Sequence, residues 1–160
     1  MAYLLDSDVL MEARKKHYGF DICPGFWDWI IAQHAAGMVL SVEKVREEIG
    51  AGNDVLVTWA AAQPEGFFAD VDAATLAVFA RVSTWAAGQA YTQGAVADFL
   101  QKADYYLVAH ALAHGCTVVT HEVPSNSINK IKIPDACNGL GVPFINPFEM
   151  LRRERARFIL

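Results

Sequence analysis

Acidic side chains stand at the ends of two apolar runs that lie far apart in the sequence. Asp6 and Asp8 follow the run Tyr3–Leu5 near the N-terminus, and Glu122 follows the run Cys116–Thr120 late in the chain. A short apolar run that stops at an acid is typical of a buried strand, and in open α/β sheets ligands collect beyond the carboxyl ends of parallel strands. We therefore expect the two strands to direct their carboxylates into one crevice.

Further acids occupy the boundaries of other predicted elements. Glu43, Glu47 and Glu48 lie on a predicted helix after a second apolar run, and Asp104 opens a helix ahead of the late strand. Several carboxylates from separate segments favour Mg²⁺ or Mn²⁺, which prefer hard oxygen ligands to His or Cys. Neighbouring side chains on a helix point about 100° apart, so normally only one of Glu47 and Glu48 can face the crevice.

The composition predicts one folded domain over residues 1–160. With 54% apolar residues and a mean hydropathy of +0.21, the chain can bury a full core. No apolar stretch approaches the roughly 20 residues that cross a bilayer, and no signal-peptide pattern opens the sequence, so we expect a cytoplasmic protein without membrane contact. Cys23, Cys116 and Cys137 form no Cys-x-x-Cys pair, which argues against a disulfide framework or a structural zinc site.

The charge is unfavourable for binding nucleic acid through a global electrostatic field. The net charge is −5 and the isoelectric point is near 5.4, whereas autonomous nucleic-acid binders are typically basic. A nucleic-acid substrate would therefore need metal ions and local basic patches to offset the repulsion. Arg14, Lys15 and Lys16 are candidates for contacting phosphates, and a solvated basic face explains them equally well.

Apolar periodicity and the positions of Gly and Pro predict strands that alternate with helices. The predicted strands are Tyr3–Leu5, Met38–Ser41, Cys116–Thr120 and Val142–Ile145. The predicted helices are Val9–Lys16, one introduced by Cys23–Gly25, Val42–Ile49, one around Leu56–Ala60, Ala73–Ala87 with Asp72 as its cap, Ala95–Leu100, Lys102–His114 stopped by Gly115, and a terminal helix with Pro147 in its first turn. The segment His121–Asn138 is predicted to be irregular. This alternation predicts a mostly parallel sheet that is covered on both faces.

Four segments in this order resemble the motif set of PIN domains: Leu4–Leu10, Ser41–Ile49, Ala103–Ala111 and Val118–Glu122. The chain is especially similar to VapC-type toxin ribonucleases and to an uncharacterised bacterial PIN-like family that shares the region Lys132–Cys137. The resemblance covers most of the chain. It implies a PIN-like three-layer α/β/α fold with a central, mostly parallel, twisted sheet of four to five strands.

The resemblance also implies a set of metal ligands. Asp6 becomes the first ligand and Asp104 the third acid, and Glu122 stands where the family usually has Asp. The second acid is either Glu47 or Glu48, of which we prefer Glu48. The expected supporting residues are Ser7, Asp8, Glu47 and Thr120. Together these residues would hold one or two Mg²⁺ or Mn²⁺ ions.

The function implied by the resemblance is a metal-dependent ribonuclease that is the toxin of a toxin–antitoxin pair. Its expected partners are an RNA substrate and a cognate antitoxin protein, and homodimers are common among similar proteins. The C-terminal segment Arg152–Leu160, rich in Arg and apolar at its end, is predicted to form a helix that docks a partner or packs across its own sheet.

Two alternatives remain at this point. A haloacid-dehalogenase-like phosphatase would use Asp6 as its nucleophile and a second acid two residues later, but it should also have a late pair of neighbouring acids, which this sequence lacks. A PIN-like domain retained as a binding module without catalysis is the other alternative, which stays open because Glu122 departs from the usual Asp. Fold analogy does not decide between them, because function belongs to the site.

Overall fold

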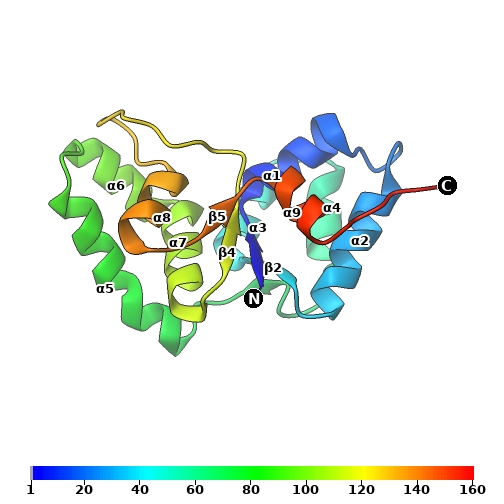
Figure 1. Ribbon diagram of the computed structural model, residues 1–160, viewed down its shortest axis with the longest axis horizontal. Helices are drawn as coiled ribbons and strands as arrows, with labels where there is room; N and C mark the ends of the chain where they lie inside the picture. The colour runs from blue at the N-terminus through cyan, green and yellow to red at the C-terminus, as the bar shows by residue number, and fades with distance from the viewer. Residues whose placement is uncertain (1) are drawn as a thin grey trace.

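Five short parallel strands form the centre of the protein in the computed structural model, which describes residues 2–160 (Figure 1). The strands are β1 (Tyr3–Leu5), β2 (Val39–Val42), β3 (Phe68–Ala69), β4 (Thr117–Val119) and β5 (Phe144–Ile145). They pair in the order β3-β2-β1-β4-β5, and every neighbouring pair is parallel. Because all five strands run the same way, their carboxyl ends meet at one edge of the sheet.

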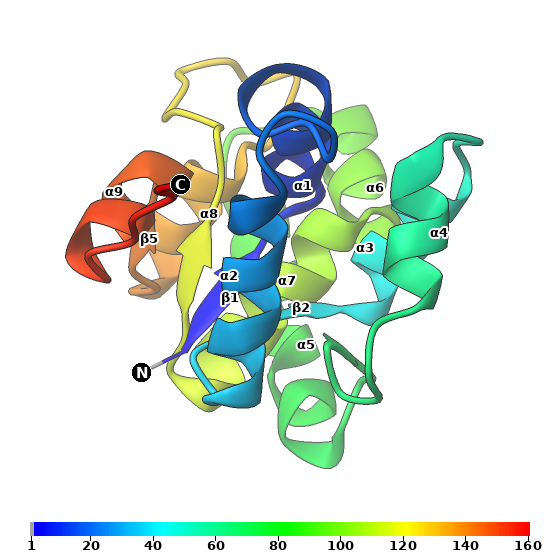
Figure 2. The ribbon, with the colours of Figure 1, turned by 90° about the vertical axis from the view of Figure 1, so that its right-hand side faces the viewer.

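Helices cover both faces of this sheet. Residues 2–160 contain nine α-helices and one π-helix: α1 (Ser7–Glu12), η1 (Ala13–His17), α2 (Pro24–Ala35), α3 (Glu43–Gly50), α4 (Val55–Ala61), α5 (Ala73–Gly88), α6 (Gln93–Gln101), α7 (Ala103–His114), α8 (Ile133–Leu140) and α9 (Pro147–Arg153). In Figure 1, α5 to α8 lie on one side of the strands, and α1, α2, α4 and α9 lie on the other. Figure 2 looks onto α2, with β1 and then α7 behind it. The predicted three-layer α/β/α fold with a central parallel sheet is confirmed.

The short strands of the sheet are held in place by burial of their side chains and by backbone hydrogen bonds. Leu4 and Leu5 of β1 and Val118 and Val119 of β4 are completely buried, because helices cover both sides of the sheet. The ladder continues past the end of β1, where the Asp6 amide donates to the Val119 carbonyl at 2.9 Å. The backbone at the carboxyl edge is therefore tied to the core before the first acidic side chain branches from it.

Most helix boundaries are set by the capping residues visible in the sequence. Asp72 accepts a 2.9 Å hydrogen bond from the Thr75 amide and caps α5, as predicted. Gly115 ends α7 with a φ of 69°, a left-handed conformation that glycine adopts without strain. Pro147 lies in the first turn of α9, where its missing N–H costs no hydrogen bond.

Several predicted boundaries are wrong. Helix α1 begins at Ser7 and not at Val9, because Asp6 caps it directly at the end of β1. The segment 121–138 is irregular only up to residue 132, after which α8 begins. Strand β3 was not predicted, since its two residues are too few to produce a periodic pattern. The helix predicted for Arg152–Leu160 stops at Arg153, and Phe158 beyond it packs against aromatic rings of the α2 side of the protein.

No helix in residues 2–160 has both the length and the apolar character needed to cross a bilayer.

Candidate functional site

Asp6 lies at the carboxyl end of β1 with both of its oxygens engaged. Its Oδ1 accepts a hydrogen bond from the Ser7 amide at 2.7 Å, and its Oδ2 accepts one from the Thr120 hydroxyl at 2.8 Å. The side chain is only 4% exposed. These contacts fix the orientation of a buried carboxylate at the meeting point of β1 and β4.

Asp8 lies beside Asp6 on the first turn of α1. Its carboxylate accepts a hydrogen bond from the His121 amide, with an N···Oδ2 distance of 3.1 Å, and its Oδ2 lies 3.3 Å from the Thr120 hydroxyl. Because that hydroxyl carries a single proton, it can donate fully to only one of the two aspartates at a time. Thr120 therefore acts as a bridge between two carboxylates that would otherwise repel each other.

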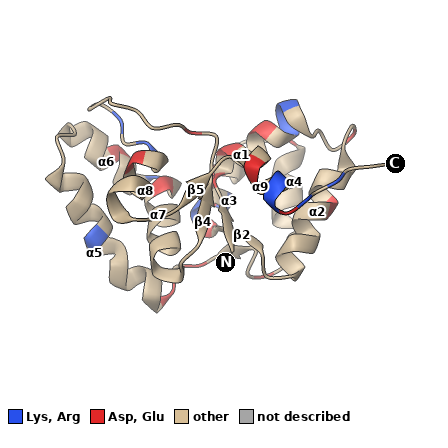
Figure 3. Ribbon diagram, in the orientation of Figure 1, with Lys and Arg blue, Asp and Glu red and all other residues tan. Residues whose placement is uncertain are grey.

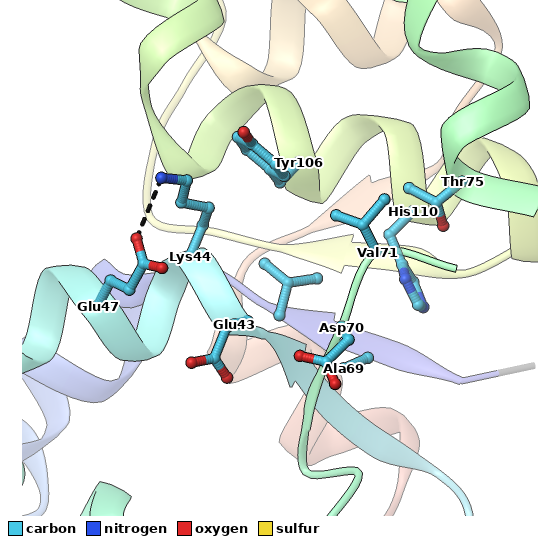
Figure 4. Close-up of a pocket in the computed structure, with 10 residues that line it drawn as sticks. Glu43, Lys44, Glu47, Ala69, Asp70, Val71, Thr75, Tyr106 and His110 are labelled. Atoms are coloured by element: carbon cyan, nitrogen blue, oxygen red, sulfur yellow. Dashed lines mark ion pairs between the residues drawn. The ribbon is translucent and has the colours of Figure 1, made fainter. Parts of the chain in front are cut away.

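Glu48, and not Glu47, faces these aspartates. Glu48 Oε2 accepts a 2.9 Å hydrogen bond from the Ser7 hydroxyl, and its Oε1 accepts a 3.1 Å hydrogen bond from the Ala103 amide. Glu47 instead forms a 3.0 Å ion pair with Lys44 and lines a separate cavity of about 190 Å³ between α3 and α7 (Figure 4). The orientation of α3 about its axis thus places Glu48 at the carboxyl edge of the sheet and Glu47 in the separate cavity.

Asp104 lies in the first turn of α7, where it does not cap the helix. The residue at the cap position is Lys102, and no hydrogen bond to the Asp104 carboxylate is found within residues 2–160. The pKa of Asp104 is raised to about 7, chiefly by burial and then by the negative charges of Glu122 and Glu48. Lys102 and Lys130 lie close enough to act in the opposite direction. Asp104 is therefore the acid of this group with the least local support for its charge.

Glu122 links the end of β4 to the start of α8. Its Oε1 accepts a 3.1 Å hydrogen bond from the Ile133 amide, and its own amide donates to Thr120 Oγ1 at 3.1 Å. The additional methylene of a glutamate lets it reach the first turn of α8 while its charge still acts on Asp6 and Asp104. The replacement of the expected Asp by Glu is therefore compatible with a place in the acidic group.

We call Asp6, Asp8, Glu48, Asp104 and Glu122 the acidic cluster. Burial raises the pKa of Asp6 well above its ordinary 3.8, and the charges of Asp8 and Asp104 add to this. Burial also raises the pKa of Asp8. Within residues 2–160, no member of the cluster forms an ion pair, although ion pairs occur elsewhere on the surface. The cluster thus gathers carboxyl groups that no basic side chain of residues 2–160 neutralises in an ion pair.

The chemistry of the acidic cluster fits a hard divalent cation. Its donors are carboxylate oxygens from separate segments, as Mg²⁺ and Mn²⁺ prefer. Cys137 lies near Asp6 and Glu122, but burial raises its pKa to about 12, so it stays a neutral thiol and not a soft ligand. Among the described residues, no three His, Cys, Asp or Glu side chains already surround one point as ligands. Side chains of the cluster would therefore have to move to surround a cation on binding.

The predicted basic residues are only partly available for a substrate. Arg14 lies 3.6 Å from Asp54 and Lys16 lies 3.1 Å from Glu12, so both are in ion pairs. Lys15 is exposed and has no such partner within residues 2–160. The sequence did not single out Lys102 or the contacts of His121, because their positions beside the acids depend on how distant segments pack.

Comparison with known proteins gives a family but no activity. No curated protein matches the chain at a significant level. A family model described as "Domain of unknown function (DUF4411)" matches residues 3–158, which is almost the whole sequence. The chain therefore belongs to the DUF4411 family.

Proposed function

We propose that this protein is a metal-dependent ribonuclease with a PIN-like fold, and that it hydrolyses RNA phosphodiester bonds with Mg²⁺ or Mn²⁺. The observation that carries this proposal is the convergence of the acidic cluster from separate segments at the carboxyl edge of a parallel sheet, without an ion pair to any member within residues 2–160. Buried carboxylates that lack basic partners are costly unless a cation binds them. A divalent cation would be bound by the carboxylates and would attract the negatively charged phosphate of the substrate to the same place.

Each acid would have a distinct part in this site. Asp6, held by two hydrogen bonds, provides a ligand that cannot turn away, and Asp104, without such bonds, is free to rotate toward a cation. Glu48 ties α1, α3 and α7 together around the site, and Glu122 has Oε2 available. A bound divalent ion would supply Lewis acidity and an activated water for attack on phosphorus.

The phosphatase alternative is less well supported. A phosphatase of that class should have a pair of neighbouring acids after the late strand, and the segment after β4 has Glu122 without a second acid beside it. A binding module without catalysis would retain the same fold, and measurement of activity distinguishes it from the nuclease.

The assignment as a toxin rests on the resemblance to VapC-type ribonucleases. An antitoxin that places a basic side chain at the acidic cluster would offset the same charge that a metal ion neutralises. We expect induction of the protein to arrest growth, and the Asp6→Asn variant to abolish the arrest. A co-expressed antitoxin should restore growth in cells that make the unaltered protein.

The nuclease activity is tested with purified full-length protein and fluorescently labelled RNA. We expect cleavage in Mg²⁺ or Mn²⁺, none in excess EDTA, and a loss of at least roughly tenfold for Glu48→Gln. The matched control is Glu47→Gln on the next position of the same helix, which should cleave like the wild type. Cleavage that persists in EDTA, or that both glutamine variants retain, would contradict the proposal.

A further inference from the structure

Three aromatic rings from separate segments meet beside the acidic cluster. His17 ends η1, His121 follows β4, and Phe148 lies on α9. The rings of His17 and His121 lie with their centroids 5.7 Å apart at an interplanar angle of 30°, and Phe148 meets them edge-on at 5.1 and 5.7 Å. These are favourable distances for aromatic pairs. We call the three side chains the aromatic platform.

The aromatic platform is open to solvent although its rings support one another. His17 is exposed, and His121 and Phe148 are half-buried. His17 reaches the other two rings at the end of a π-helical turn, a rare conformation that often occurs at functional sites. The three side chains therefore keep part of their surface in contact with solvent, where a ligand can reach them.

A groove runs from two rings of the aromatic platform to one member of the acidic cluster. It has a volume of about 370 Å³, and its lining includes His121, Phe148, Glu122 and a second carboxylate, Glu149. Its size lies within the range of pockets that hold small organic groups. The backbone amide of His121 donates to Asp8, so the platform and the cluster share one segment of chain. A group bound in this groove would be adjacent to the carboxylates.

Positive charge flanks the same edge of the sheet. Figure 3 shows basic residues in the segment after α1 on one side of the strands and in the loop before α8 on the other. Lys15, two positions before His17, is exposed and has no ion pair within residues 2–160. Lys130 lies near enough to Asp104 to lower its pKa. A polyanion crossing the acidic cluster would therefore meet a cation on each side of it.

We propose that the aromatic platform and its groove bind a nucleobase of single-stranded RNA and thereby hold the adjoining phosphodiester at the acidic cluster. The inference rests on the proposed function and adds a substrate-binding subsite to it. Unpaired bases expose flat π faces, and proteins bind them by stacking on aromatic side chains beside cations that contact the backbone. Stacking of this kind tolerates different bases, so the subsite would position the strand without reading its sequence.

Binding is measured separately from cleavage, with fluorescence anisotropy of a labelled single-stranded RNA in Mg²⁺. The parent protein is full-length Asp104→Asn, and the test variants add His17→Ala, His121→Ala or Phe148→Ala. We expect each to lose at least roughly fivefold in RNA affinity, while the ring-preserving His121→Phe stays within about twofold of the parent. His34→Ala, which removes a half-buried ring at the opposite edge of the sheet, is the matched control.

A second titration identifies base stacking directly. An abasic nucleotide is moved along the RNA, and one position should weaken binding to the parent but cause no further loss in Phe148→Ala. Parent-like affinity of the alanine variants, or an abasic penalty that persists in them, would overturn the inference. Because His17 is exposed, His17→Ala gives a result even if a buried substitution unfolds the protein. Cleavage by the wild type is scored independently, so failure of the nuclease proposal and failure of this subsite give different results.

Discussion

Replacing Asp104 by Asn should stabilise the folded protein while it abolishes the proposed activity. Asp104 is placed among negative charges and lacks a hydrogen bond within residues 2–160, and its pKa is raised from 3.8 to about 7. Between these two values the folded protein holds a proton on Asp104 that the unfolded chain has lost. The free energy of unfolding therefore falls as the pH rises from about 4 to about 7, and levels off above that. Asn carries no charge and is free of this penalty.

The shift in pKa sets the size of the effect. A rise from 3.8 to about 7 corresponds to an upper limit of about 4 kcal/mol at pH values above 7. Because the side chain is still partly accessible to solvent, screening reduces the repulsion, and we expect a gain of about 2 kcal/mol for Asp104→Asn at about pH 8. At about pH 3 the carboxyl group is neutral in the folded state and mostly neutral in the unfolded state, so the gain should nearly vanish.

Urea denaturation in EDTA at several pH values measures this difference. The control is Asp28→Asn, which removes an exposed acid of α2 that has no ion pair within residues 2–160. Millimolar Mg²⁺ should then raise the stability of the wild type, because a ligand that binds only the folded state stabilises it. The same addition should have little effect on Asp104→Asn.

A stability difference between wild type and Asp104→Asn that does not change with pH would contradict the raised pKa of Asp104. A variant that is less stable than the wild type at about pH 8 would do the same, because it would mean that the Asp104 carboxylate has favourable contacts in the folded state. If the pH dependence is found but Mg²⁺ stabilises both proteins equally, the electrostatic account stands and Asp104 is not a metal ligand.

Three further predictions concern single substitutions. Thr120→Val removes the hydroxyl that bridges two aspartates and should lower the free energy of unfolding by about 1 to 3 kcal/mol, measured by urea denaturation at neutral pH. Gly139→Ala places a methyl group against the Trp85 indole and should cost about 1 to 3 kcal/mol, whereas Gly94→Ala, where the added methyl meets nothing, should not. Glu48→Gln should weaken Mg²⁺ binding in calorimetry, and an unchanged affinity would remove this residue from the metal site.

The order of the secondary structure was accessible from the sequence because it depends on local chemistry. Apolar runs predicted four of the five strands, and the caps at Asp72 and Gly115 define helix ends through contacts within a few residues. Helix α8 was missed because Pro, Asn and Gly in its sequence suggested a loop. Its apolar residues nevertheless recur with helical spacing, and burial against α5 and α7 outweighs their weak helix propensity.

The composition of the acidic cluster was only partly accessible. The acids at the ends of β1 and β4 could be placed, because strands of a parallel sheet end at the same edge. The choice of Glu48 over Glu47 is made by the rotation of α3, which Val45 and Ile49 fix by packing into the core. Because Glu47 and Glu48 are neighbours in the sequence, their positions alone do not show which of the two faces the crevice.

The candidate carboxylates, and the sheet edge at which the strands place them, follow from the sequence alone, because alternation and capping act over a few residues. Tertiary structure alone decided the protonation of Asp104, the link from Glu48 to Ala103, and the meeting of His17, His121 and Phe148. These features require the folded structure, because burial, electrostatic repulsion and ring contacts depend on distances between separate segments of the sequence, which only the packing of helices on the sheet establishes.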